Sequence, residues 1–135
     1  MAQDVQLISI SDRGVYLLAK NANIAVPDSG FVDLLELEVE RISRVIVEIA
    51  VAGFALDGFE ILGRVHSEGS WLTLASLSTD YTAPSGIIVK ASGNLAALAV
   101  GVGWVVVDTL GLASLKLRAN AAPGGSTVST YASGG

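Results

Sequence analysis

The sequence predicts an all-β protein, an antiparallel two-sheet β-sandwich with an extended N-terminal arm. Apolar and polar residues alternate with a period of two in short runs, such as residues 35–40, 45–51 and 114–119, and this spacing places successive side chains on opposite faces of a strand. Segments rich in glycine separate the runs and supply turns. We expect roughly eight to ten strands, with a jelly roll as one arrangement and a closed barrel as the main structural alternative.

Length and composition indicate one sandwich domain with an apolar surface. The chain has 135 residues, of which 51% are hydrophobic and 16% are charged, whereas soluble proteins usually carry about 25% charged residues. We assign residues 1–30 to an N-terminal arm or first short strands, and residues 31–135 to the β-sandwich domain. We expect another chain to cover part of the apolar surface.

Charge and residue types argue against several classes of partner. The formal net charge is -5 and the sequence has no basic run, so we expect no nucleic-acid binding, which needs cationic patches. The absence of cysteine excludes disulfides and thiolate metal sites. The sequence shows no signal peptide and no run of about 18 apolar residues, so we expect neither export nor membrane association.

The N-terminal arm candidate is rich in turn residues. Residues 5–10 and 15–19 are short strand candidates on either side of a turn-like segment. We expect a loop at residues 21–30, which contain two asparagines, a proline and a glycine. Such an end can add a strand to the sheet edge of another chain.

Residues 33–52 give the strongest strand signal. A single amphipathic helix is the rival interpretation, but the β-branched run at residues 45–51 favours a strand pair. The opposite face of the second strand is itself partly apolar, so we expect this strand to be central and covered on both faces. The alternating sets are Leu35, Leu37 and Val39 against Glu36, Glu38 and Glu40, and then Val45, Val47, Ile49 and Val51 against Ile46, Glu48 and Ala50.

The remaining strands are shorter. The clearest feature is a final hairpin of residues 114–119 and 127–131 around a reversal at residues 120–125, with Leu115, Leu117 and Ala119 on its buried side. Before it we expect a hairpin connection at residues 53–58, strands at residues 59–66, 71–75, 87–91 and 104–108, a turn at residues 68–70, and a long loop or crossover at residues 76–85.

Two stretches of the sequence also resemble each other. Residues 35–49 and 105–119, which lie 70 positions apart, both contain an alternating strand, an acidic residue, a turn of small residues and another strand. If the repeat is structural, each half contributes an equivalent pair of strands to one sandwich.

The residues with catalytic potential are few. His66 is the one histidine of the chain, and we interpret it as a solvated residue at a strand end, because Ser67 beside it projects from the opposite sheet face. Glu36, Glu38 and Glu40 share a face, but a solvated strand face is not the cleft that paired catalytic carboxylates need. We therefore expect no catalytic residues, no metal site and no cofactor.

Four further features have structural interpretations. Asp57 and Asp108 are typical of turns, and the Gly101-Val102-Gly103 segment reads as a turn, since no helix follows it to form a phosphate site. Aromatic residues on sandwich strands usually anchor cores or interfaces, although a sugar-stacking platform is the alternative. The aromatic residues in question are Trp71, Trp104, Tyr81 and Tyr131.

The C-terminal part, residues 59–135, resembles small β-sandwich virion proteins of tailed bacteriophages, namely decoration (cement) proteins and head- or tail-fibre modules. The resemblance lies in residues 59–64 leading to 69–71, residues 81–84, residues 103–108 running into 112–119, and the ending at residues 125–133. It transfers no functional residue, because these families share no active site.

The resemblance implies a non-enzymatic protein of the virion, assembled in the host cytoplasm. Its partner would be the major capsid protein or another virion protein, and it would form a homo-oligomer, with a trimer favoured. The alternative is a carbohydrate- or receptor-binding module that exposes Trp71, Tyr81 or Trp104. An enzyme would need a pocket that gathers His66 with at least two carboxylates.

Overall fold

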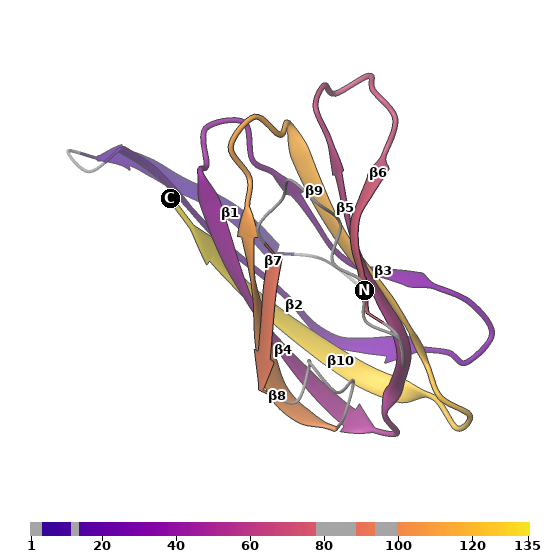
Figure 1. Cartoon of the computed structure of the whole chain (residues 1–135). Coiled ribbons are helices and arrows are strands. Elements are labelled where there is room, and N and C mark those ends of the chain that lie inside the picture. The colour runs from indigo at the N-terminus through magenta and orange to yellow at the C-terminus, as the bar shows by residue number, and fades with distance from the viewer. Residues whose placement is uncertain (1–3, 12–13, 78–88, 94–99) are drawn as a thin grey trace.

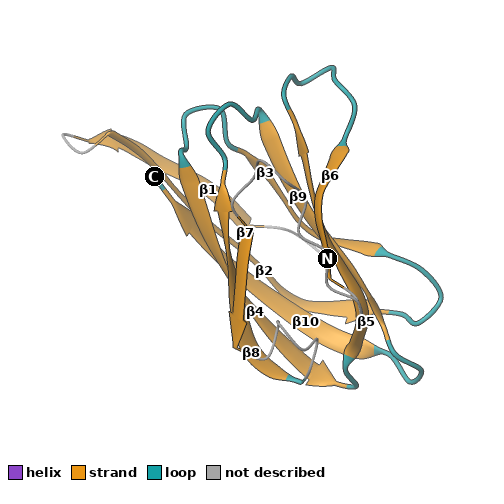
Figure 2. Cartoon of the chain, viewed as in Figure 1, coloured by secondary structure: helices purple, strands orange, loops and turns teal. Residues whose placement is uncertain are grey.

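The computed structural model describes residues 4–11, 14–77, 89–93 and 100–135, and it describes the side chains of residues 17–76 and 100–135. Ten strands in this part of the chain form two antiparallel sheets (Figures 1 and 2). The strands are β1 (Asp4–Ser11), β2 (Gly14–Val26), β3 (Val32–Glu38), β4 (Arg44–Gly53), β5 (Leu56–Arg64), β6 (Leu72–Leu77), β7 (Val89–Gly93), β8 (Gly101–Asp108), β9 (Ser114–Ala121) and β10 (Ser126–Gly134).

Strand pairing is nested, because strands near the start of the chain pair with strands near its end. β2 pairs with β10, β3 with β9, β4 with β8, and β5 with β6. This arrangement is a jelly roll. One sheet has the order β1-β2-β10-β4-β8-β7 and the other β3-β9-β5-β6, so β1 and β7 extend the edges of the first. The predicted sandwich is confirmed, in its jelly-roll form.

The core lies between the two sheets and uses the residues that the alternation selected. Leu35 and Leu37 of β3, Leu115 and Leu117 of β9, and the inward side chains of β4 are at most 5% exposed. Each fully buried side chain of this kind contributes about 1.5–3 kcal/mol to folding. The glutamates that alternate with them are exposed. Phe59 of β5 is the largest side chain in the core.

The repeat seen in the sequence corresponds to two matching turns. Residues 39–43 link β3 to β4, residues 109–113 link β8 to β9, and each turn carries the chain from one sheet to the other. The backbone N–H of Val39 donates to the carbonyl of Ala113 at 2.9 Å, and that of Thr109 donates to the carbonyl of Ser43 at 3.0 Å. A shift of 70 residues replaces Val39 by Thr109 and Ser43 by Ala113, so each of the two hydrogen bonds is the counterpart of the other. The sequence repeat is therefore also a structural repeat.

The connections, in contrast, differ from the prediction. The predicted final hairpin is two strands in different sheets, since β9 belongs to the four-stranded sheet and β10 to the six-stranded one. The strand pair expected at residues 33–52 and the hairpin connection at residues 53–58 are wrong for the same reason. Both sheets present an apolar inner face, so the period of two identifies a strand and its buried side but not its sheet.

The loop predicted at residues 21–30 is correct for residues 27–30 but wrong for residues 21–26, because β2 continues to Val26. Asn23 has a φ of 55° at a register shift between β2 and β10, and asparagine tolerates this left-handed conformation. Its backbone N–H donates to Ser129 Oγ at 2.9 Å. The side chain of Asn21 reaches the other sheet, where Nδ2 donates to the carbonyl of Leu34 at 2.8 Å. Both asparagines therefore belong to strand β2 and form hydrogen bonds that hold it in place.

The N-terminal region is a β-hairpin. β1 pairs with β2, and the last pair between β2 and β10 joins Leu17 to Gly134. The β2 residues before Leu17 pair with β1 alone among the described strands, and the hairpin extends past the end of β10 near the C-terminus (Figure 1). We call this projecting hairpin the arm, while the rest of β2, from Leu17 to Val26, pairs with β10 within the six-stranded sheet.

One further prediction is wrong, and others concern residues that the structure does not describe. The Gly101-Val102-Gly103 segment is the beginning of β8 and not a turn. The predictions for residues 78–88 and 94–99, which include Tyr81, Pro84 and most of the long loop, concern residues outside the described part of the chain.

Replacing Thr109 by valine tests the matched turns. The buried hydroxyl of Thr109 donates to the carbonyl of Ile42, and its loss leaves that acceptor without this donor, so we expect a loss of about 1–2 kcal/mol of unfolding free energy. Valine fits the site sterically, since the equivalent position of the other turn is Val39.

Urea unfolding measures this effect. The matched control is Thr73→Val at an exposed threonine of β6, for which we expect a change below about 0.5 kcal/mol. Equal unfolding midpoints for the two variants would contradict the assigned role of Thr109.

Candidate functional site

His66 lies in the exposed loop between β5 and β6. Its Nδ1 accepts a hydrogen bond from the backbone N–H of Glu68 at 3.0 Å, and its carbonyl accepts one from Gly69 at 2.8 Å. The ring therefore helps to close the turn. A shallow pocket of about 240 Å³ places it near Ser67 and Glu40, and Glu40 is the one carboxylate among the described residues that line this pocket.

Glu36 and Glu38 share the exposed face of β3, as predicted, but the three glutamates have different neighbours. Glu36 lies 3.6 Å from the Nζ of Lys116, Glu38 is opposite Ser114 in the register, and Glu40 follows the end of β3. Among the residues that the structure describes, no group of three or more His, Asp or Glu side chains is arranged to hold a metal ion.

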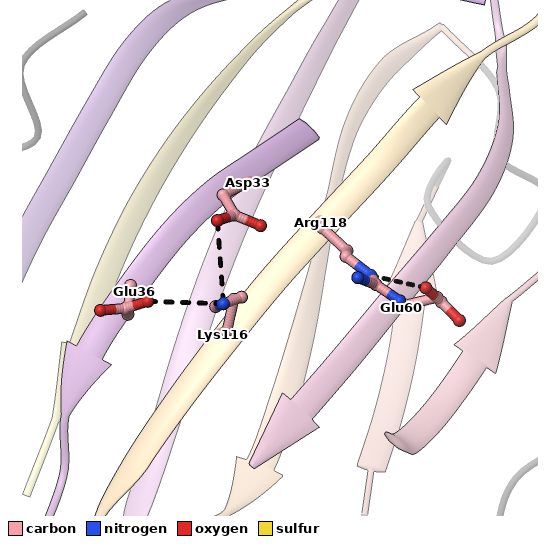
Figure 3. A network of polar contacts seen from close by, with 5 residues as sticks. All are labelled: Asp33, Glu36, Glu60, Lys116 and Arg118. Atoms are coloured by element: carbon pink, nitrogen blue, oxygen red, sulfur yellow. Dashed lines mark hydrogen bonds and ion pairs between the residues drawn. The ribbon is translucent and has the colours of Figure 1, made fainter. Parts of the chain in front are cut away.

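The outer face of the four-stranded sheet, here called the charged face, pairs its charges internally (Figure 3). Lys116 of β9 lies between Glu36 and Asp33 of β3, with the second distance 3.8 Å. Arg118 of β9 donates from Nε to Glu60 of β5 at 2.7 Å. Acidic strands thus flank a basic one, and opposite charges on neighbouring strands stabilise a sheet.

Trp71 also belongs to the charged face. The guanidinium of Arg64 and the ammonium of Lys116 each lie 4.4 Å from the centre of its ring, which is within the range of cation–π interactions. Arg118 lies over Phe31 in the same way, at 5.2 Å. The cations and aromatic rings of this face are therefore engaged within the chain.

The outer face of the six-stranded sheet has the opposite character. Large apolar side chains from four adjacent strands are exposed there, and we call this surface the apolar face. β4 is central as predicted, but the prediction that its second face is covered is wrong within this chain, because Ile46 is 46% exposed. The residues of the apolar face are Leu18 of β2, Tyr131 of β10, Ile46 of β4, and Val102 and Trp104 of β8, all between 43% and 52% exposed.

The strand register brings these side chains into rows. Tyr131 is aligned with Glu48 of β4, and Glu48 with Trp104 of β8, while Val102 is aligned with Ala50 of β4. The apolar side chains therefore extend across β10, β4 and β8, with Glu48 among them. A patch of this extent is typical of protein interaction sites.

The remaining candidates have local roles. Asp108 Oδ1 accepts a hydrogen bond from the backbone N–H of Leu110 at 3.1 Å, as expected for an aspartate that caps a turn. Asp57 is exposed on β5. No helix in the described part of the chain has the length and apolarity required to cross a membrane.

Comparison with known proteins identifies the fold. No protein-family profile and no curated protein sequence matches the chain. The fold is similar to that in the crystal structure of the SPBc2 prophage-derived protein YomS, with a TM-score of 0.53 and 15% sequence identity. The match covers 93% of this chain and 98% of that one. The two proteins therefore share one fold over nearly their whole length.

Replacing Arg118 by methionine tests the pairing on the charged face. The change leaves Glu60, whose side chain is 17% exposed, without its partner, and we expect a loss of about 1 kcal/mol of unfolding free energy. Arg41→Met at an exposed turn residue is the control. Chemical denaturation of both variants gives the comparison, and identical stabilities would show that the Arg118 pair contributes nothing.

Proposed function

We propose that the chain is a non-enzymatic structural protein of a phage virion, and specifically a capsid decoration (cement) protein that binds and stabilises the head. The observation that carries this proposal is the apolar face, which extends over four strands and exposes five large apolar side chains among the described residues. Such a surface is suited to another protein surface rather than to a small substrate.

The fold is in keeping with this function. A jelly roll is a frequent architecture of viral capsid proteins and of lectins, and the structural neighbour is described as prophage-derived. A fold by itself hosts many functions, so the proposal relies on the surface of this chain.

The hairpin of β1 and β2 supplies a second contact. β1 is an edge strand with β2 as its neighbour in the sheet, and a strand edge can pair with the sheet of another chain. We assign this arm to contacts with the major capsid protein or another virion protein. The protein is then located in the virion after assembly in the host cytoplasm, and copies of it associate with one another.

Add-back to particles tests the proposal. Heads prepared from a phage deleted for this gene should bind the purified protein to saturation and should then release their DNA at a higher temperature. A variant lacking residues 1–13 retains β2 with its β10 contacts and loses β1, so we expect its binding to fall by about tenfold, since an added strand supplies main-chain hydrogen bonds.

The matched control is Glu68→Lys, which changes an exposed loop residue and should bind as the unmodified protein does. Virions whose mass spectrum lacks the protein, together with heads that do not bind it, would reject the proposed function.

The alternative is a carbohydrate- or receptor-binding module of a tail or head fibre. Tyr131 and Trp104 flank Glu48 on the apolar face, with two strand spacings, about 9.6 Å, between them. Titration with cell-surface glycans should then quench the fluorescence of Trp104 in a Trp71→Phe variant. An unchanged spectrum with every glycan, combined with binding to heads, would exclude this alternative.

A further inference from the structure

The apolar face has a regular arrangement about β10. In one row the register aligns Leu18 of β2 and Ile46 of β4 with the same β10 residue, Ser133. In the next row it aligns Lys20 of β2 and Glu48 of β4 with Tyr131. Apolar residues thus flank β10 in the first row, and opposite charges flank it in the second.

Beyond the row of Ser129, where the register of β2 shifts, a third row follows the same rule. Ala25 of β2 and Ala52 of β4 are both aligned with Thr127 of β10, and all three are exposed. In each of the three rows, the β2 residue and the β4 residue are therefore of matching size or of opposite charge.

This arrangement is the one that a two-fold axis along β10 requires. When two copies stack face to face about such an axis, β2 of one copy lies over β4 of the other and each residue stays in its row. Leu18 then meets the partner's Ile46, and Lys20 meets the partner's Glu48. A two-fold interface uses the same patch on both copies, which must be complementary to itself.

We infer that the apolar face is an interface with a second copy of this chain, related by a two-fold axis along β10. The inference uses the sheet alone, and with the apolar face covered by a second copy, the arm of β1 and β2 remains for contacts with the head. Within one chain, β10 lies between the strands of Lys20 and Glu48, and Asp4 of β1 is aligned with Lys20 on its other side. In the dimer, each of these charges gains an opposite charge.

The area of the apolar face is sufficient for an interface with a second copy of the chain. Only the five strands within two positions of β10 overlap about this axis, namely β1, β2, β10, β4 and β8. At about 4.8 Å apart and about eight residues long, with about 3.3 Å per residue, they span about 630 Å². Specific protein–protein interfaces bury about 600–1,000 Å² on each partner. A trimer, in contrast, joins two different patches on each copy and would leave the match across β10 unused.

Charge reversal tests the inference on the purified full-length chain. Sedimentation equilibrium should give the mass of two copies for the unmodified protein. Glu48→Lys and Lys20→Glu each place like charges opposite one another twice in the dimer, so we expect the dissociation constant to rise by at least about tenfold. The double variant Lys20→Glu with Glu48→Lys restores opposite charges and should dimerise within about threefold of the unmodified protein.

Glu68→Lys is the matched control, because it makes the same change of charge on a loop away from the apolar face and should leave the dimer intact. Circular dichroism of each variant establishes that it is folded. A mass of one copy or of three for the unmodified protein would overturn the inference. A dimer that both single reversals leave unchanged would also overturn it.

Cross-linking gives an independent readout. The chain contains no cysteine, so Ser133→Cys introduces a single thiol on the strand that carries the axis, where it faces its own counterpart. A short bismaleimide should link the two copies of this variant, whereas Thr73→Cys on the exposed part of β6 should remain unlinked. Equal linking of both variants would place the contact elsewhere.

Discussion

The structure depends on the mutual burial of two sheets, since the inner face of each is removed from water by the other. Leu34 and Leu35 of β3 and Val45 and Val47 of β4 have no measurable exposure, although β3 and β4 belong to different sheets. Neither sheet has another source of apolar cover in the described chain. The chain therefore has to pass repeatedly from one sheet to the other, and nested pairing accomplishes this.

The two matched turns are the points where that passage is most strongly constrained. Each reverses the chain within five residues and exchanges a backbone hydrogen bond with the other. They fix the relative position of β3, β4, β8 and β9 across the two sheets. The contact from Asn21 to the carbonyl of Leu34 adds a further link between the sheets, although Asn21 Oδ1 is buried without a hydrogen-bond partner among the described atoms.

The two outer faces show how one fold separates stability from interaction. On the charged face, ion pairs and stacked aromatic rings satisfy the side chains within the chain. On the apolar face, Ile46, Trp104 and Tyr131 stay about half exposed, so association with another surface would remove apolar area from water. Both sheets bury their inward residues equally well. The two outer faces therefore differ only in the types of residue that point outward from their strands.

The sequence by itself determined most of the strands, the buried sides of β3, β4 and β9, and the repeat. Alternation of leucine with glutamate at residues 35–40 selects the buried side of β3, and the offset of 70 residues identifies two equivalent turns. It also indicated that β4 is central and that its second face is apolar. Each of these properties is set by residues close together in the chain, which is why pattern and spacing reveal them.

Only the tertiary structure decided which strands share a sheet. Strands 114–119 and 127–131 read as one hairpin, yet they lie in opposite sheets, and the two asparagines that indicated a loop support β2. The sequence also did not show which residues form the apolar face. This face arises because strands far apart in the chain become neighbours by register, and its residues include Leu18, Ile46, Trp104 and Tyr131. Partners distant in sequence are chosen by the fit of the whole core, and local alternation carries no information about that choice.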